Sequence, residues 1–387
     1  MRIAISGASG YIGQHLSSFL EGKGYDVIPL GRDLFKEDCF DELCRCVESC
    51  EVVINLAGAS INKRWTEAYK QELYDSRICV TRQLVHAINT RSVKLELFIS
   101  ASAVGYYPAF GEYDEYHDCR GMDFLARLCG AWEEEASACS SDVSLVITRF
   151  GVVLSEDGGA LKEMLRLQRF SRVSVVIGNG QQRFPWISLF DLCRSFGYII
   201  RNRQMRGVVN LVSPDLITQK QLAHTLARAD KIRRIIPLPE FFFRLKFGEG
   251  ASFVTKGQTV HPSKLQESGF IYIYPTIEKL MNITDHHTVP ELDVKRYMGR
   301  WYEIARYENH FERGMTDVTA TYTLLPDGKI RVENEGYKGG VHKKATGRAK
   351  QPDPKNNPGK LKVAFFLWFY ADYYILELDA DYQYAVI

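Results

Sequence analysis

The chain opens with a short apolar run followed by a glycine-rich turn, Arg2-Ile3-Ala4-Ile5-Ser6-Gly7-Ala8-Ser9-Gly10-Tyr11-Ile12-Gly13, and this stretch decides the fold of its first part. The apolar run predicts a buried strand, and the residues after the second glycine predict a helix. A glycine turn alone is also compatible with a simple tight turn. Where strand, glycines and helix coincide, the backbone can approach a pyrophosphate and the helix N-terminus offers free amide hydrogens. We therefore predict an adenine dinucleotide site that includes Gly7, Ser9, Gly10, Tyr11, Ile12 and Gly13.

Working outward from this turn, short β-branched segments alternate with helical patterns up to about residue 150. Strands are expected at residues 2–6, 26–30, 52–56, 95–100 and 144–149. This alternation is typical of βαβ units and predicts a Rossmann-type parallel sheet. A helix is also expected near 123–136. From residue 151 to 280 the pattern is more mixed and indicates a substrate lobe, with strands near 173–177 and 207–212 and helices near 191–200 and 219–229.

The sequence changes character at Thr284-Asp285-His286-His287-Thr288-Val289-Pro290, a short polar segment closed by a proline. Beyond it, period-two patterning and hairpin turns predict an antiparallel sheet or barrel, with strands at 318–324, 330–335, 360–366 and 373–378. We expect a first domain over residues 1–284 with its dinucleotide-binding core in about 1–150, a linker at 285–290 and a second domain at 291–387.

Composition narrows the classes of function. A chain of 387 residues with 45% hydrophobic residues is globular and long enough for two domains. The net charge of +2, without a dense Lys/Arg run, gives no reason to expect nucleic acid or an anionic membrane surface, so a small molecule is the default partner. The first residues lack a signal-peptide pattern and no apolar stretch reaches the roughly 20 residues of a membrane span, so we expect a cytoplasmic protein.

Nine cysteines occur, and an odd number without a secretion signal predicts reduced thiols. Four of them cluster at Cys39, Cys44, Cys46 and Cys50, which raises the question of a metal site. The apolar neighbours Phe40, Leu43 and Val47 fall at helical spacing and no histidine is near, so we interpret the cluster as core and expect no metal.

The second expected strand ends at Gly31-Arg32-Asp33. At this place an NAD enzyme usually has an acid for the ribose hydroxyls, and an NADP enzyme an arginine for the extra phosphate. Arg32 comes first and favours NADP, whereas Asp33 leaves NAD open and a solvated Arg/Asp pair is the alternative. The third strand ends in Asn55-Leu56-Ala57-Gly58, small residues that suit either the ligand crevice of such a sheet or ordinary core packing.

Residues 1–284 resemble the atypical, extended short-chain dehydrogenase/reductases known as nucleoside-diphosphate-sugar epimerase-like proteins. The resemblance runs through residues 55–58, 64–66, 75–77, 100–107, 123–124, 132–133, 157–161 and 185–187, and its C-terminal family region covers about 237–284. It implies the extended epimerase architecture. It also implies cofactor contact at Arg32, Leu56, Ala57, Glu72, Arg77 and Val153, beside Gly31 and Gly58.

The same resemblance exposes a missing catalytic pair. These enzymes use a tyrosine whose phenol is activated by a lysine four residues later, with a serine partner. No tyrosine of this chain has a lysine at that spacing, and the corresponding positions fall near Leu125 and Cys129. Ser102 matches the family serine, and Tyr106 and Tyr107 are the remaining candidates, with aromatic packing as the alternative role.

Two further departures weaken an inherited substrate. Arg77 stands where relatives carry an asparagine, and it is placed to contact a phosphate or an acid such as Glu72. Ser188 and Phe190 stand where relatives more often carry His and Asp.

The second domain resembles a bacterial lipocalin through residues 292–307, 311–314 and 318–322. That family implies an antiparallel barrel around one small apolar ligand. Phe365, Phe366, Trp368, Phe369 and Tyr370 suit either a cavity lining or core. The sequence stops at Tyr384-Ala385-Val386-Ile387, inside the expected seventh strand, so we expect the barrel to be truncated and the natural protein to continue or the chain to be a fragment.

The sequence thus predicts an NADP-dependent oxidoreductase or epimerase-like enzyme acting on a small molecule, fused to a lipocalin that binds an apolar ligand. One alternative is a dinucleotide-binding sensor or scaffold without turnover. Another is a pair of modules that share a lipid-like substrate, one binding it and one reducing it.

Overall fold

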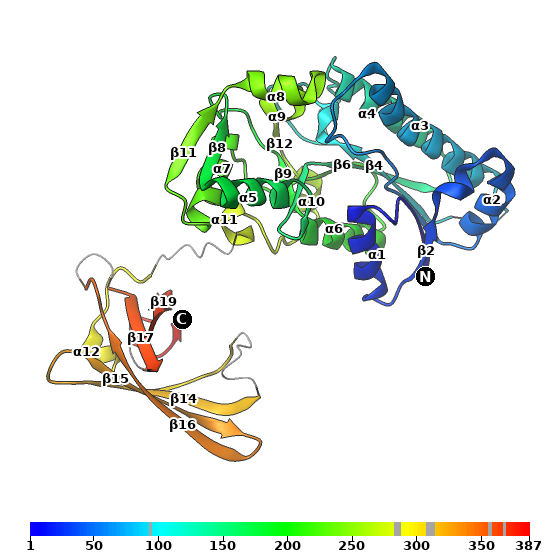
Figure 1. The fold of residues 1–387 in the computed structure, drawn as a ribbon. Helices are drawn as coiled ribbons and strands as arrows, with labels where there is room; N and C mark the ends of the chain where they lie inside the picture. Colours follow the sequence, from blue (N-terminus) through cyan, green and yellow to red (C-terminus); the bar gives the residue numbers. More distant parts are fainter. Residues whose placement is uncertain (93–94, 282–287, 307–313, 355–357, 367–368) are drawn as a thin grey trace. The chain divides into compact units, whose positions relative to one another are not determined.

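The computed structural model describes the chain except for residues 93–94, 282–287, 307–313, 355–357 and 367–368. It divides into two compact units, Met1–Ile283 and Thr284–Ile387, which we call the front unit and the rear unit (Figure 1).

A six-stranded parallel sheet forms the centre of the front unit, in the order β10-β6-β4-β3-β1-β2. Its strands are β1 (Arg2–Ser6), β2 (Asp26–Leu30), β3 (Val52–Asn55), β4 (Leu97–Ala103), β6 (Ser144–Phe150) and β10 (Gly207–Leu211). The chain places β2 on one side of β1 and β3 on the other, so the strand order reverses at β1. In open α/β sheets the ligand crevice lies at such a reversal, outside the carboxyl ends of the strands. The predicted Rossmann-type sheet is confirmed.

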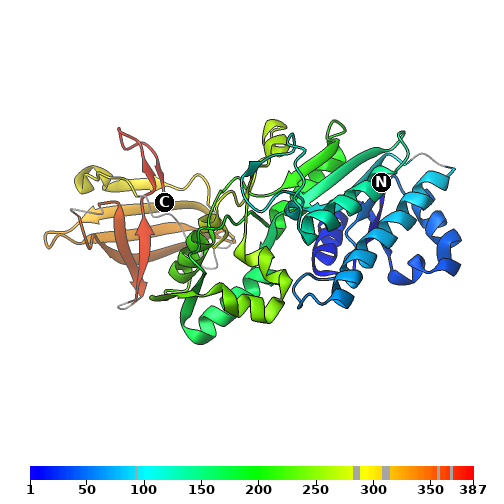
Figure 2. The same ribbon diagram turned by 90° about the horizontal axis from the view of Figure 1, so that it is seen from above.

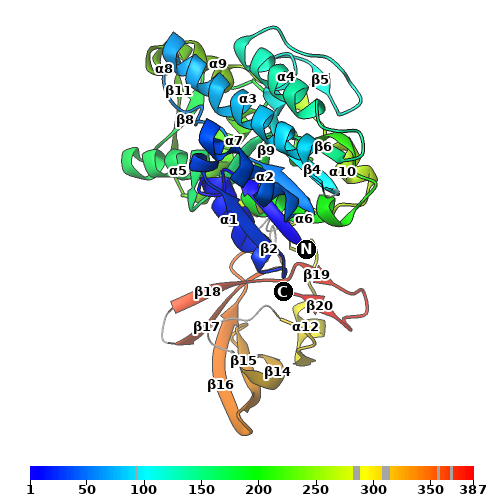
Figure 3. The same ribbon diagram turned by 90° about the vertical axis from the view of Figure 1, so that its right-hand side faces the viewer.

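Helices cover both faces of this sheet, which explains the unbroken apolar strands. Ile3 and Ile5 of β1 point into the core beneath α1 (Tyr11–Glu21) and α6 (Leu189–Arg201). Ala4 points into the opposite core with residues of α2 (Phe40–Glu48) and α3 (Glu67–Thr90). α4 (Phe124–Ser137) packs beside α3 and against β4, as the views in Figures 1 and 3 show.

The expected substrate lobe consists of small parallel strand pairs and short helices. The pairs are β7 (Val152–Ser155) with β9 (Trp186–Ser188), β8 (Val173–Ile177) with β11 (Arg234–Leu238), and β5 (Glu112–Tyr113) with β12 (Thr259–Val260). The helices are α5 (Gly159–Ser171), α7 (Gln219–Ala229), α8 (Glu240–Phe247), α9 (Ser252–Thr255), α10 (Ser263–Glu267) and α11 (Ile277–Leu280). Single 3-10 turns occur at η1 (Arg32–Phe35), η2 (Glu37–Cys39), η3 (Val104–Tyr106) and η4 (Glu249–Ala251).

Three cysteines of the cluster pack into the core around α2, and Cys39 lies outside that core. Cys50 is buried there, and Cys44 and Cys46 pack against the cluster that holds Leu43 and Val47. Within the described ranges, no group of three His, Cys, Asp or Glu side chains is placed to hold a metal ion. Among the helices described, none is both long and apolar enough to cross a bilayer.

The rear unit is a curled antiparallel sheet in which consecutive strands are neighbours (Figures 1 and 2). After α12 (Val294–Tyr297), its strands are β13 (Gly299–Tyr302), β14 (Met315–Leu324), β15 (Ile330–Lys338), β16 (Val341–Lys350), β17 (Lys360–Phe366) and β18 (Phe369–Tyr374). A separate hairpin joins β19 (Glu377–Leu378) to β20 (Ala385–Val386). The lipocalin-like antiparallel architecture expected from the sequence is confirmed.

The prediction of one strand over residues 373–378 is wrong, because these residues belong to two strands, β18 and β19. β18 ends at Tyr374, because the next residues change partners: the Ile375 amide donates to the Gly359 carbonyl oxygen and the Leu376 amide to that of Val386. β16 was not predicted from the sequence, because most of its residues are exposed on both faces and show no period-two pattern.

The core of the rear unit contains three tyrosines joined through their hydroxyls. The Tyr373 hydroxyl lies 3.0 Å from that of Tyr297 and 2.8 Å from that of Tyr322. In the aromatic run that begins in β17, Phe365 is 42% exposed, so this side chain serves neither as buried core nor as an enclosed lining. Tyr370 lies beneath the Lys350 ammonium. The side chains of Phe366 and Phe369, and all of Trp368, lie outside the described residues.

Candidate dinucleotide site

The glycine turn after β1 meets the turn after β3 without room for a side chain. Gly7 has φ +74°, in the left-handed region, and a Cβ there would lie 2.8 Å from the carbonyl carbon and oxygen of Leu56. The Leu56 amide donates to the Ser6 carbonyl oxygen at 3.1 Å, which holds the two turns together. The reversal point of the sheet is therefore lined by bare backbone.

Helix α1 starts equally close to this turn. A Cβ on Gly13 would lie 2.2 Å from the Gly7 carbonyl oxygen, so only glycine allows the first helical turn to sit against the strand end. Gly10 is the N-cap and supplies no side-chain bond, and the first amides of a helix have no partner within the helix. A pyrophosphate fits such a cradle of small residues and free amides. Tyr11 and Ile12 are half-buried beside it, and Ser9 is exposed.

The end of β2 presents positive charge. Gly31 is the N-cap of η1, and Arg32 is exposed directly after it. The Asp33 carboxylate lies 2.5 Å from the Lys36 ammonium, and the hydrogen bond from Lys36 lowers the pKa of Asp33. Since Asp33 and Lys36 are paired with each other, Arg32 is the exposed cation of this turn that is left to face an anion.

A buried polar network supports the end of β3. Asn55 accepts a hydrogen bond from the Ser6 hydroxyl at 2.6 Å and donates one to the Thr81 hydroxyl at 2.8 Å. The Trp132 indole also donates to Thr81, at 2.9 Å. This network fixes the backbone from which the half-buried Leu56 and Ala57 and the exposed Gly58 follow.

Arg77 of α3 fills the space beneath Gly58. Its guanidinium donates to the carbonyl oxygens of Leu73 and Ala59 and lies 5.2 Å from the Trp132 ring. Burial lowers the pKa of Arg77, and among the described residues no carboxylate forms an ion pair with it. Glu72, named as its possible acidic partner, is exposed on α3.

The lobe reaches this site through the turn after β7. A Cβ on Gly158 would lie 2.3 Å from the Tyr11 ring, so the turn packs directly on the first residue of α1. Val153 is half-buried on β7 and pairs with Ile187 of β9. The predicted cofactor residues of the glycine turn, β3 and β7 therefore gather around one strand reversal, whereas Glu72 is separate on the surface of α3.

The structure places Ser102 inside β4, which runs to Ala103 rather than to residue 100, because its pairing with β6 continues through Ser102 and Arg149. The Ser102 hydroxyl is buried and donates to Glu133 Oε1 at 2.6 Å. Arg149 donates two hydrogen bonds to the same carboxylate, at 2.8 and 2.7 Å. Burial opposes the charge on Arg149, but Glu133 raises its pKa above the usual value.

Two tyrosines follow Ser102 and have different surroundings. Tyr106 packs on the Arg149 guanidinium, 3.5 Å from the ring centroid, and its hydroxyl donates to Asp118 at 2.9 Å. Tyr107 is buried, and its hydroxyl donates to the Asn210 side chain at 3.0 Å. Burial raises the pKa of both phenols, and Asp118 raises that of Tyr106 further.

α4 carries the positions of the missing tyrosine and lysine. Leu125 is half-buried, and its Cβ lies 3.4 Å from the position of a Cβ on Gly105. Cys129 is buried, and burial raises the pKa of its thiol to about 12. Neither side chain can exchange a proton with an alcohol near neutral pH.

Sequence reasoning missed the buried Glu133–Arg149 pair. Glu133 belongs to the Trp132-Glu133 motif, but nothing in the sequence shows that its partner comes from β6. The pair joins α4 to the sheet directly behind Ser102.

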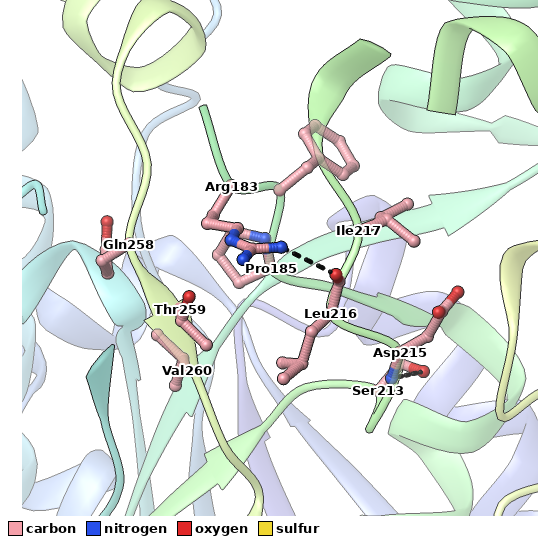
Figure 4. A pocket seen from close by; sticks show the side chains of 10 residues that line it. Arg183, Pro185, Ser213, Asp215, Leu216, Ile217, Gln258, Thr259 and Val260 are labelled. Carbon is pink, nitrogen blue, oxygen red and sulfur yellow. Dashed lines mark hydrogen bonds between the residues drawn. The ribbon is translucent and has the colours of Figure 1, made fainter. Parts of the chain in front are cut away.

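A small pocket in the lobe lies near the end of β10 and is lined by none of the predicted site residues (Figure 4). Arg183 extends across it and donates to the Leu216 carbonyl oxygen at 3.1 Å. Burial raises the pKa of Asp215, which also accepts a hydrogen bond from the Ile277 amide. The other lining residues include Ser213, Gln258 and Thr259.

Comparison with known proteins supports the fold and divides the chain into three matched regions. A model of the NAD dependent epimerase/dehydratase family matches residues 3–211, more than half of the chain. The chain belongs to this family. A domain of unknown function (DUF1731) follows at residues 238–282, and a lipocalin-like domain matches residues 292–387.

Relatives within the epimerase family cover the front unit. The epimerase family protein SDR39U1 homolog of Arabidopsis thaliana, described as chloroplastic, is 33% identical over 297 residues, which are 72% of this chain and 85% of the relative. The epimerase family protein YfhF of Bacillus subtilis is also 33% identical and covers 75% of this chain and all of its own length. The crystal structure of human SDR39U1 isoform 2 with NADPH is 31% identical, with a TM-score of 0.67, and covers 73% of this chain and 98% of that one.

Proposed function

We propose that the front unit binds NADP(H) and acts as an oxidoreductase or epimerase-like enzyme on a small molecule, while the rear unit binds a small apolar ligand. The observation that carries this proposal is the side-chain-free cradle at Gly7 and Gly13, beside Leu56. The human relative with NADPH supports the choice of cofactor, as does Arg32 beside Lys36.

The residues suited to hold the cofactor have separate tasks. The amides of Tyr11 and Ile12 would hold the pyrophosphate, and Arg32 would hold the ribose phosphate that distinguishes NADP from NAD. The half-buried Leu56 and Ala57 contribute backbone at the strand reversal. When bound, the nicotinamide supplies a hydride donor or acceptor.

Tyr106 is the phenol best suited to donate a proton. Its hydroxyl is protonated at neutral pH, as in any tyrosine, and the raised pKa makes it a weak acid that would give up its proton only to a carbonyl oxygen on which negative charge develops during reduction. With a hydride supplied by the bound cofactor, the role of Tyr106 would be to provide the proton that completes the alcohol. The hydroxyls of Ser102 and Tyr107 donate hydrogen bonds to Glu133 and Asn210, so both residues stabilise the structure around Tyr106.

A second function, cofactor sensing without turnover, is favoured by one specific observation. Leu125 and Cys129 occupy the acid–base positions, and the Ser102 hydroxyl is already donated to a buried carboxylate. A cofactor sensor needs the glycine cradle that binds the nucleotide, but it needs no side chain that donates a proton.

Titration of the full chain with NADPH and with NADH, followed by nicotinamide fluorescence, tests the shared premise. Absence of binding by both nucleotides overturns both functions. NADPH oxidation is then screened over aldehydes and ketones, with Tyr106→Phe and Ser102→Ala as variants. Turnover that Tyr106→Phe abolishes supports the enzyme, whereas tight NADPH binding without turnover on any carbonyl supports the sensor.

A further inference from the structure

Helix α8 exposes three large apolar side chains on one face. Phe241 is 64% exposed, Phe242 52% and Leu245 61%, and no residue of the helix is buried. Phe241 and Leu245 are four positions apart and Phe242 is adjacent, so the three share one side of the helix. Scattered apolar residues on a surface need no explanation, but a contiguous apolar face marks an interaction site.

The structure holds this face firmly toward solvent. The Trp65 amide donates to the Phe247 carbonyl oxygen and the Arg64 guanidinium to that of Leu245, both at 3.1 Å. Phe243 and Phe247 are half-buried on the remaining side, and Gly250 lies against the Trp65 ring. α8 is therefore fixed to the segment that follows β3, at the edge of the front unit (Figure 1).

Two exposed cations, Arg244 and Lys246, lie on α8 itself, and three more lie around the start of β11, the strand before it. From residue 231 to 247 the chain carries five exposed cations, Lys231, Arg233, Arg234, Arg244 and Lys246. The carboxylate within this stretch is Glu240, 3.9 Å from Arg244, and the two that flank it, Asp230 and Glu249, are paired with Arg169 and Lys70. The whole-chain charge of +2 conceals this local excess, which the sequence analysis did not weigh.

Charge decides between the occupants that an apolar face can have. A second copy of the chain docking face to face would bring its own Arg244 and Lys246 against the same two side chains, and like charges brought together across an interface are costly. An anionic lipid surface offers phosphates for the cations and an acyl region for Phe241, Phe242 and Leu245. We propose that α8 docks the front unit peripherally on anionic membranes.

Cosedimentation of the full chain with lipid vesicles tests this docking. The protein is expected to sediment with vesicles of phosphatidylcholine mixed with phosphatidylglycerol, and much less with phosphatidylcholine alone. The double variant Phe241→Ser/Phe242→Ser should bind the mixed vesicles at least about tenfold more weakly, because the apolar contact is lost. Arg244→Glu/Lys246→Glu keeps the apolar face and should lose the preference for anionic lipid.

Phe170→Ser is the matched control, since Phe170 of α5 is 91% exposed and lies outside α8. It should bind as the unaltered chain does, and unchanged thermal unfolding shows that each variant is folded. Three results overturn the proposal: no sedimentation with mixed vesicles, equal sedimentation of the Phe241/Phe242 variant, or an equal loss in the control. Dimers that the Phe241/Phe242 variant abolishes, without vesicle binding, would assign the face to a second copy instead.

Discussion

At the scale of single residues, we expect Arg32 to determine whether the front unit prefers NADPH to NADH. Its neighbour Asp33 is paired with Lys36, and within the described part of the chain Arg32 forms no ion pair, so it is placed to face the ribose phosphate. Arg32→Ala should weaken NADPH binding about tenfold and leave NADH nearly unchanged, because a charge-assisted bond to phosphate contributes about 1.5–3 kcal/mol. Calorimetric titration with both nucleotides measures this. Arg45→Ala, an exposed arginine on α2, is the control, and a loss of equal size for both nucleotides would contradict the assignment.

The buried pair of Glu133 and Arg149 has a structural role that a second substitution tests. Glu133→Ala leaves the Arg149 guanidinium buried without its carboxylate and removes the acceptor of Ser102. We expect a loss of about 3–5 kcal/mol in the free energy of unfolding, the usual cost of breaking a buried pair. Denaturant unfolding measures it, and Glu134→Ala, on the same helix with an exposed side chain, should change it little. A loss below about 1 kcal/mol would show that the pair does not support the site.

At the scale of elements, the packing of α1 on β1 depends on Gly13. In Gly13→Ala the new methyl group meets the Gly7 carbonyl oxygen at 2.2 Å, so the helix must move away from the strand. We expect a destabilisation of about 1–3 kcal/mol from overpacking, together with at least a tenfold loss of NADPH affinity as the amides shift. Gly22→Ala, at the far end of the same helix and in a right-handed conformation, should retain affinity. Normal NADPH binding by Gly13→Ala would show that close packing at this glycine is not needed for cofactor binding.

The elements also show how far the sequence predicts the molecule. β1, β2 and the glycine turn are local patterns, so their residues predict them to within one position. The Glu133–Arg149 pair joins residues on different elements, and a buried charge cannot be distinguished from an exposed one before its partner is placed. β16 shows no alternation, and α8 carries four phenylalanines that indicate core by composition although two of them are exposed. The catalytic assignment of Ser102, Tyr106 and Tyr107, and the cytoplasmic location, stay predictions.

At the scale of the whole molecule, each unit has its own hydrophobic core, so each should unfold with its own response to ligand. NADPH at about 100 times its dissociation constant should stabilise the front unit by about 2.7 kcal/mol, since only the folded state binds. Calorimetric scans should then show one transition that moves upward with NADPH and one that does not.

Tyr373→Phe assigns the second transition to the rear unit. The substitution removes the hydroxyl that bonds both Tyr297 and Tyr322, at an expected cost of about 1–3 kcal/mol because these groups are buried. The transition that ignores NADPH should fall by a few degrees, while the NADPH-dependent one keeps its temperature. A single transition that responds to both the nucleotide and Tyr373→Phe would mean that the units unfold together, and the rear unit could then report on the cofactor bound to the front unit.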